Sequence, residues 1–125
     1  MNGRRIRVLV VDDEVEVLET LAAFLEDQGF DVLTAERGDE ALKILGRVRI
    51  DVAIIDMRLR QYDGNTLIIA ARRVQRGTKF LVHTGSSYYT PPPEIAALGI
   101  TQEDVFMKPV RRLNTLCAAI YRHVQ

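Results

Sequence analysis

The sequence predicts one α/β domain of the (βα)5 type, a doubly wound parallel sheet with helices on both faces. Short apolar runs alternate about five times with amphipathic segments of helical length, without linker or low-complexity stretches. The length of 125 residues, with 47% hydrophobic and 27% charged side chains, fits one ordinary globular domain. Parallel strands need right-handed crossover connections, which place helices on both faces of the sheet.

The first two strand–helix pairs follow from hydrophobic periodicity. Ile6–Val11 is too short for a helix and rich in β-branched residues, which predicts a buried parallel strand. Glu14–Gln28 has apolar residues at spacings of three and four and is followed by Gly29, which predicts a helix with a glycine stop. Asp31–Ala35 is predicted as the second strand, and Gly38 to about Arg47 as a short second helix.

The third strand is predicted at Asp51–Asp56, in the centre of the sheet. Its segment Val52–Ile55 is apolar throughout, which indicates that both faces of the strand are covered. Asp63 and Gly64 then form a turn signal that leads into a third helix at about Asn65–Gln75.

The remaining elements surround a proline-rich segment. Lys79–Thr84 is predicted as the fourth strand. Gly85–Pro93 contains three consecutive prolines, so we expect a loop there, followed by a short helix near Glu94–Leu98. Asp104–Lys108 is predicted as the fifth strand, and the apolar stripe of Leu113–Val124 as the last helix.

Composition excludes several classes of protein. The single cysteine, Cys117, cannot form an internal disulfide, so we expect a reducing, cytoplasmic location. The longest apolar runs have four to five residues, far short of the roughly 20 that cross a bilayer. Acidic residues interrupt the first apolar stretch too soon for a secretory signal. A formal net charge of zero and a pI near 6.7 give no global electrostatic reason to expect nucleic acid as a partner.

Polar residues occur at the carboxyl ends of four predicted strands. Asp12 and Asp13 follow the first strand, and Asp56, Thr84 and Lys108 end the third, fourth and fifth. These ends meet at one crevice in a doubly wound sheet. Three neighbouring carboxylates resist ionising unless a cation neutralises them, and an all-oxygen ligand set favours Mg²⁺. With a lysine and a hydroxyl opposite as donors, the sequence predicts a site for phosphoryl chemistry on a carboxylate.

Five short motifs occur in order along the chain: Val10-Val11-Asp12-Asp13-Glu14, Ile54-Ile55-Asp56-Met57, Tyr62-Asp63-Gly64, Thr84-Gly85 and Met107-Lys108-Pro109. As an ordered set they resemble the receiver domain of two-component response regulators, chemotaxis regulators included, over essentially the whole chain. The resemblance implies a flavodoxin-like fold with strand order 2-1-3-4-5. It also implies one receiver domain over residues 1–125, with no output domain in this chain.

The resemblance implies a role for each residue of the crevice. Asp56 would be the phosphoacceptor, and Thr84 and Lys108 would contact the phosphoryl oxygens. Mg²⁺ would be bound by Asp13, Asp56 and the backbone carbonyl of Arg58, with Asp12 holding a metal-bound water. The resemblance also implies a cis peptide bond between Lys108 and Pro109.

The chain departs from the family pattern at the residue that usually responds to phosphorylation. Family members usually carry Tyr or Phe three residues before the lysine, and that ring changes rotamer with phosphorylation. Here the position is Val105, which is stiff at χ1 and has no ring. The segment Ser86–Pro93 would replace much of the fourth helix. Tyr88 or Tyr89 is a candidate substitute for the missing ring.

We therefore expect a signalling domain that catalyses only its own phosphorylation and dephosphorylation. It would take a phosphoryl group from a sensor histidine kinase or phosphotransfer protein onto Asp56 with Mg²⁺, then switch its protein partners. Neither direct nucleic-acid binding nor membrane contact is expected. Kinase recognition would lie within Glu14–Ala22.

Two alternatives stay open. The first is a receiver-like binding module that is not phosphorylated, motivated by Val105 and the altered fourth-helix region. The second is a dehalogenase-like phosphatase, which needs an Asp-x-Asp motif that Asp12-Asp13-Glu14 does not supply. Asp12 and Asp13 also have a structural interpretation, as caps of the first helix.

Other conspicuous residues are interpreted as structural. We predict that His83 lies on the strand face opposite to Thr84, and that Cys117 packs in the core. His123 suits the negative end of the last helix dipole. The basic cluster of Arg72, Arg73, Arg76 and Lys79 is interpreted as a solvated face.

Overall fold

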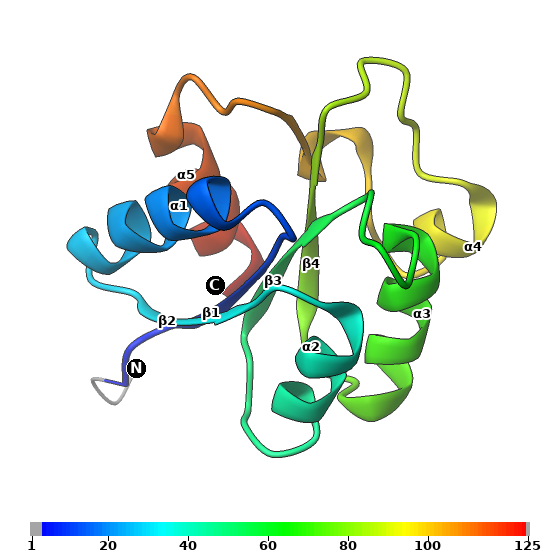
Figure 1. Cartoon of the computed structure of the whole chain (residues 1–125), viewed down its shortest axis with the longest axis horizontal. Helices are drawn as coiled ribbons and strands as arrows, with labels where there is room; N and C mark the ends of the chain where they lie inside the picture. Colours follow the sequence, from blue (N-terminus) through cyan, green and yellow to red (C-terminus); the bar gives the residue numbers. More distant parts are fainter. Residues whose placement is uncertain (1–3, 125) are drawn as a thin grey trace.

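The computed structural model describes residues 4–124 and confirms the predicted (βα)5 architecture. One sheet of five strands has the order β2-β1-β3-β4-β5, and every neighbouring pair is parallel (Figure 1). The strands are β1 at Arg7–Val11, β2 at Asp31–Ala35, β3 at Val52–Asp56, β4 at Lys79–Thr84 and β5 at Val105–Met107.

Helices cover both faces of the sheet, α1 and α5 on one face and α2 and α3 on the other (Figure 1). They are α1 at Val15–Asp27, α2 at Gly38–Leu45, α3 at Gly64–Val74, α4 at Pro93–Ala96 and α5 at Leu113–Val124. None of the helices in the described residues is long and apolar enough to span a membrane.

Two hydrophobic layers separate the sheet from its helices. Because alternate strand residues face opposite sides, Leu9 and Val11 pack toward α2 and α3, while Val8 and Val10 pack toward α1 and α5. All five residues of β3 are buried, which confirms its central position. Cys117 is buried in the layer beneath α5, as predicted.

The predicted boundaries are accurate to a few residues, and the differences have local causes. The first helix ends as predicted, because Gly29 takes a positive φ of 95° that other residues rarely adopt. The fifth strand is shorter than predicted. Asp104 belongs to a 3-10 turn, η1 at Gln102–Asp104, where its side chain accepts the N–H of Thr101 and closes a capping box.

The segment between β4 and α4 is an extended loop that ends in a single helical turn. Pro92 lies at the N-cap position of α4 and Pro93 occupies its first position, where a missing N–H costs nothing. Tyr88 is 92% exposed. Tyr89 instead packs against the core beside α3, and its hydroxyl donates to Asn65 Oδ1 at 2.6 Å.

Candidate phosphoacceptor site

The carboxyl edge of the sheet brings the predicted site residues together. Asp12 and Asp13 follow β1, and Asp56 ends β3 beside them, because β1 and β3 are hydrogen-bonded neighbours. Asp12 and Asp56 are buried at 1% and 4% exposure, while Asp13 is half-buried. The crevice thus holds two buried carboxylates and a third at its mouth.

The three carboxylates form a group that fits a hard divalent cation. One oxygen from each of Asp12, Asp13 and Asp56 lies within 4.8 Å of the others. Oxygen donors without nitrogen or sulfur are the ligands that Mg²⁺ prefers, and Mg²⁺ sites commonly use few carboxylates with water and phosphate. The donor set therefore suits Mg²⁺.

Lys108 reaches into the same group from the loop after β5. Its ammonium lies 2.8 Å from Asp12 Oδ2 and 3.3 Å from Asp56 Oδ2. It also contacts Glu14 Oε1 at 3.2 Å. Its backbone N–H donates to the carbonyl of Thr84 at 2.7 Å, so β4 positions the start of the loop. The peptide bond that follows, to Pro109, is cis.

The surroundings of Asp56 in the crevice disfavour the ionised form of its carboxyl group. Burial raises the pKa of Asp56 to about 6, and the nearby charge of Asp12 adds to this effect. The N–H of Arg58, which donates to Asp56 Oδ1 at 3.2 Å, and the ammonium of Lys108 act in the opposite direction. The pKa of Lys108 is itself raised, because the carboxylates around it outweigh the effect of its burial.

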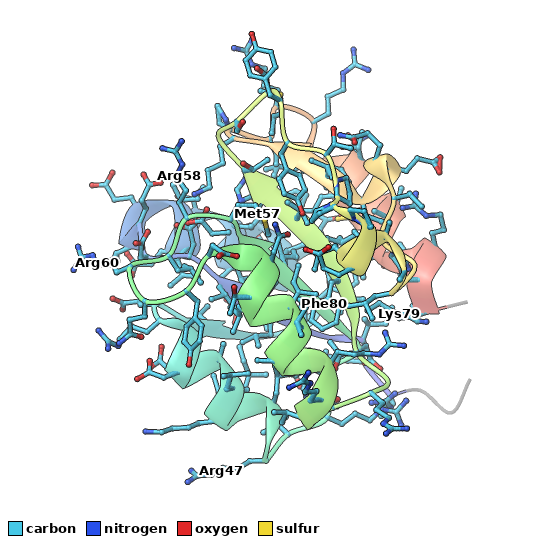
Figure 2. All side chains as sticks on the ribbon, turned by 90° about the vertical axis from the view of Figure 1, so that its right-hand side faces the viewer. Arg47, Met57, Arg58, Arg60, Lys79 and Phe80 are labelled. Carbon is cyan, nitrogen blue, oxygen red and sulfur yellow. The ribbon has the colours of Figure 1, made fainter. Side chains whose placement is uncertain are left out.

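Thr84 and Arg58 complete the predicted set. Thr84 is the buried last residue of β4, and its hydroxyl accepts the N–H of Ser86 at 3.1 Å. Arg58 is exposed, and Figure 2 shows its side chain, with that of Arg60, extending outward from the loop after β3. Arg60 Nε lies 4.0 Å from Asp13 Oδ2, a loose ion pair that the sequence did not reveal.

The interpretation of Asp12 and Asp13 as helix caps is wrong for this chain. The residue at the N-cap of α1 is Glu14, which makes no side-chain capping hydrogen bond. Asp12 Oδ1 accepts the N–H of Glu14 at 2.9 Å, so it orders the turn before the helix while its other oxygen faces Lys108. Sequence reasoning also missed Glu14 as a partner of Lys108, because nothing local signals a contact between residues so far apart in the chain.

Val105 and His83 lie on opposite faces of the sheet. Val105 packs half-buried against the layer that contains α3. His83 is buried on the other face, where it lines a pocket with residues of α1 and α5. Burial lowers the pKa of His83 to about 4, and the charge of Lys108 contributes to this shift, so the imidazole is neutral at physiological pH.

Known proteins resemble this chain in sequence and in architecture. The family model of the response regulator receiver domain matches residues 8–121. The transcriptional regulatory protein GlrR of Escherichia coli is 34% identical over 113 residues, which are 88% of this chain and 24% of GlrR. The alkaline phosphatase synthesis regulator PhoP of Bacillus subtilis is 30% identical over 118 residues, covering 93% of this chain and 48% of PhoP. The chain thus spans about a quarter of GlrR and about half of PhoP.

Solved structures of receiver domains have the same fold as this chain. TrrA of Thermotoga maritima, crystallised in complex with Mg²⁺ and BeF, superposes with a TM-score of 0.81 at 26% identity. The receiver domain of the hybrid histidine kinase CckA gives a TM-score of 0.77 at 29% identity. Each alignment covers 95% of this chain and 99% of the other. With a family model matched over residues 8–121, this chain belongs to the response regulator receiver domains, the signalling domains of two-component systems.

Proposed function

We propose that this domain accepts a phosphoryl group on Asp56 in the presence of Mg²⁺, from a phosphohistidine of a sensor histidine kinase or phosphotransfer protein. The observation that carries the proposal is the convergence of three carboxylates and one lysine at the carboxyl edge of the sheet. The proposed setting is the cytoplasm, and the proposed output is a change in protein contacts. The domain would catalyse only its own phosphorylation and dephosphorylation.

The proposed reaction is an in-line transfer. A carboxylate oxygen of Asp56 attacks phosphorus, the P–N bond of the donor breaks, and its electron pair stays on the imidazole nitrogen, which takes up a proton. The product is an acyl phosphate on Asp56. Lys108 would offset negative charge on the equatorial oxygens of the transferring group, and Thr84 would donate a hydrogen bond to one of them.

The Mg²⁺ would be held by Asp13, Asp56 and the carbonyl of Arg58, and by Asp12 through a bound water. When bound, the ion supplies positive charge that lowers the cost of bringing a phosphoryl group to a cluster of carboxylates. Asp56 must be ionised to attack. Lys108 and the N–H of Arg58 favour that ionised form within the chain itself.

The proposed switch runs through the loop after β4. Thr84 would have to turn its O–H toward Asp56 to donate to the phosphoryl group, and the same oxygen accepts the N–H of Ser86. That change would move the loop, which Tyr89 connects to α3 through Asn65. Val105 offers no aromatic ring at the usual family position, so we assign the coupling to Tyr89.

We place the docking surface of the phosphodonor beside the crevice. A pocket of about 570 Å³ lies between α1 and the start of α5 and includes the side chains of Lys108 and His83. Its other walls are mainly apolar: Val17, Leu21, Pro109, Val110 and Leu113. A donor helix could cover this surface and bring its histidine toward Asp56.

Intact-mass measurement after incubation with Mg²⁺ and acetyl phosphate tests the proposal. We expect one added phosphoryl group on the wild type and on Glu26→Gln, an exposed acidic position outside the cluster, and none on Asp56→Asn. The lack of an adduct on a folded wild type, together with the lack of a beryllofluoride complex, would reject phosphorylation. The unphosphorylated binding module, which Val105 favours, would then be the better description.

A further inference from the structure

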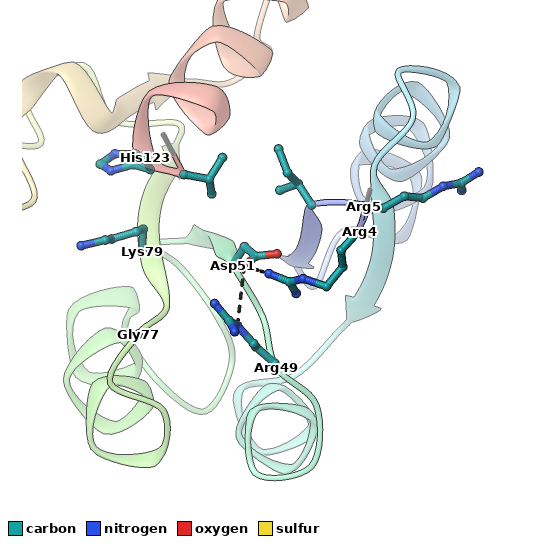
Figure 3. Close-up of a pocket in the computed structure, with 9 residues that line it drawn as sticks. Arg4, Arg5, Arg49, Asp51, Gly77, Lys79 and His123 are labelled. Carbon is teal, nitrogen blue, oxygen red and sulfur yellow. Dashed lines mark hydrogen bonds and ion pairs between the residues drawn. The ribbon is translucent and has the colours of Figure 1, made fainter. Parts of the chain in front are cut away.

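A pocket rich in cations lies at the opposite edge of the sheet from the acidic crevice. Figure 3 shows it between the starts of β1, β3 and β4 and the end of α5. Its volume is about 270 Å³. The charged side chains that line it are Arg4, Arg5, Arg49, Asp51, Lys79 and His123. The lining thus contains four permanent cations and one carboxylate.

The single carboxylate arranges the cations but does not neutralise them. The side chain of Asp51 is 9% exposed and accepts the N–H of Arg7 at 2.8 Å. Arg4 approaches Asp51 Oδ1 at 3.3 Å and Arg49 approaches the same oxygen at 3.8 Å, from different directions (Figure 3). The lining carries four permanent positive charges against one negative charge, so a positive field extends into the pocket.

Helix dipoles do not explain these cations. Arg72 and Arg73 lie in the last turn of α3, where the negative end of a helix attracts them. Arg49 instead lies in the loop before β3, and Lys79 begins β4, so neither belongs to a helix. Lys79 makes no ion pair with any residue from 4 to 124.

The positive surface continues beyond the first pocket. A second pocket of about 80 Å³ shares Lys79 and His123 with it and adds Arg72. Lys79 therefore lies between two concave regions that both carry arginine. Arg72 and Lys79, which the sequence analysis assigned to a solvated face, thus line concave pockets.

We propose that this amino-edge pocket binds the phosphate group of a small phosphate ester, with Arg49 and Lys79 as its principal contacts. Arginine forks match the paired oxygens of phosphate, and lysine adds a point charge. The concave shape favours a compact anion over a long polymer, whose backbone needs an extended track of cations. The site lies at the other end of the strands from Asp56, so it would bind independently of phosphorylation.

Titration of the metal-free protein with pyrophosphate, followed by two-dimensional amide NMR at physiological salt, tests the proposal. Without metal, the carboxylates of the crevice repel the probe. We expect shifts around Gly77, which lines the pocket, and about a tenfold weaker affinity in the double variant Arg49→Gln, Lys79→Gln. The double variant Arg111→Gln, Arg112→Gln removes the same charge from exposed positions before α5 and should bind like the wild type.

The proposal is overturned by a lack of saturable shifts, by equal weakening in both double variants, by equal shifts with sulfate at matched ionic strength, or by tighter binding of a short DNA duplex with a steep salt dependence. The last would reassign the surface to nucleic acid. Adenosine monophosphate and inorganic phosphate, titrated in parallel, distinguish an ester from the free ion. Saturable binding of adenosine monophosphate tighter than that of inorganic phosphate supports the ester, and the reverse order overturns it.

Discussion

The ammonium of Lys108 lies nearer to Asp12 than to Asp56, at 2.8 Å against 3.3 Å. In the unphosphorylated domain its strongest partner is therefore a residue that does not accept the phosphoryl group. Glu14, at 3.2 Å, holds it from a third side. Lys108 is already positioned and charged before a donor arrives, and a small displacement would bring it to a phosphoryl oxygen on Asp56.

Replacing Lys108 by Gln should slow phosphorylation and destabilise the metal-free fold. Loss of one charged donor to a transition state costs about a hundredfold in rate or more, which a time course of intact mass with acetyl phosphate would measure. Without the ammonium, buried Asp12 and Asp56 lose their common counter-charge, so we expect the free energy of unfolding to fall by about 3 kcal/mol. Arg111→Gln, which removes a positive charge outside the crevice, is the control. Wild-type rates in Lys108→Gln would refute the role of this lysine.

Asp56 and His83 should give opposite pH dependences to the stability of the metal-free protein. The pKa of Asp56 rises from 3.8 to about 6, so between these values the native state binds more protons than the unfolded state. Its contribution therefore weakens stability as pH rises through this window. The pKa of His83 falls from 6.5 to about 4, so its contribution strengthens stability as pH rises through nearly the same window.

Single variants should separate the two effects. Between about pH 4 and 6, Asp56→Asn should steepen the rise of unfolding free energy with pH, and His83→Leu should flatten or reverse it, each by about 2 kcal/mol relative to wild type. Urea unfolding at a series of pH values, without divalent cation, measures both slopes. Identical slopes in all three proteins would contradict the buried state of these two groups.

Gly64 should tolerate no side chain. A Cβ at this position would lie 2.7 Å from Met57 Cα, and the Gly64 N–H donates to the Met57 carbonyl at 2.9 Å, so the backbone has little room to move. Gly64→Ala should therefore lower the free energy of unfolding by about 2 kcal/mol. A Cβ at Gly77 meets nothing within 4 Å, so Gly77→Ala should change it by less than about 0.5 kcal/mol. Urea unfolding of the two variants checks the difference, and equal effects would contradict the close approach.

Sequence reasoning predicted the parts of this domain that depend on local pattern and on strand ends. Parallel topology alone brings Asp56 beside Asp12, because both follow neighbouring strands. It could not predict that Glu14 would turn toward Lys108, since that contact depends on the path of a loop. The position of Asp104 in a capping box, where a strand was predicted, could not be predicted for the same reason. Its buried carboxylate binds Arg122 at 2.8 Å and His123 at 2.7 Å, partners supplied only when α5 packs.

Tyr89 gives the last prediction, because its contacts suit the coupling that Val105 cannot provide. Its ring packs against the layer that also contacts Val105, and its hydroxyl donates to Asn65 at 2.6 Å. Tyr89→Phe keeps the ring and removes the hydrogen bond, which should lower the free energy of unfolding by about 1 kcal/mol. Phosphorylation of Asp56 should proceed at the wild-type rate, because the hydroxyl lies outside the crevice. Amide shifts that beryllofluoride induces in α3 should, however, shrink markedly, while Tyr88→Phe, at a 92% exposed position, should leave them intact. If α3 responds equally in both variants, the hydrogen bond between Tyr89 and Asn65 does not carry the signal.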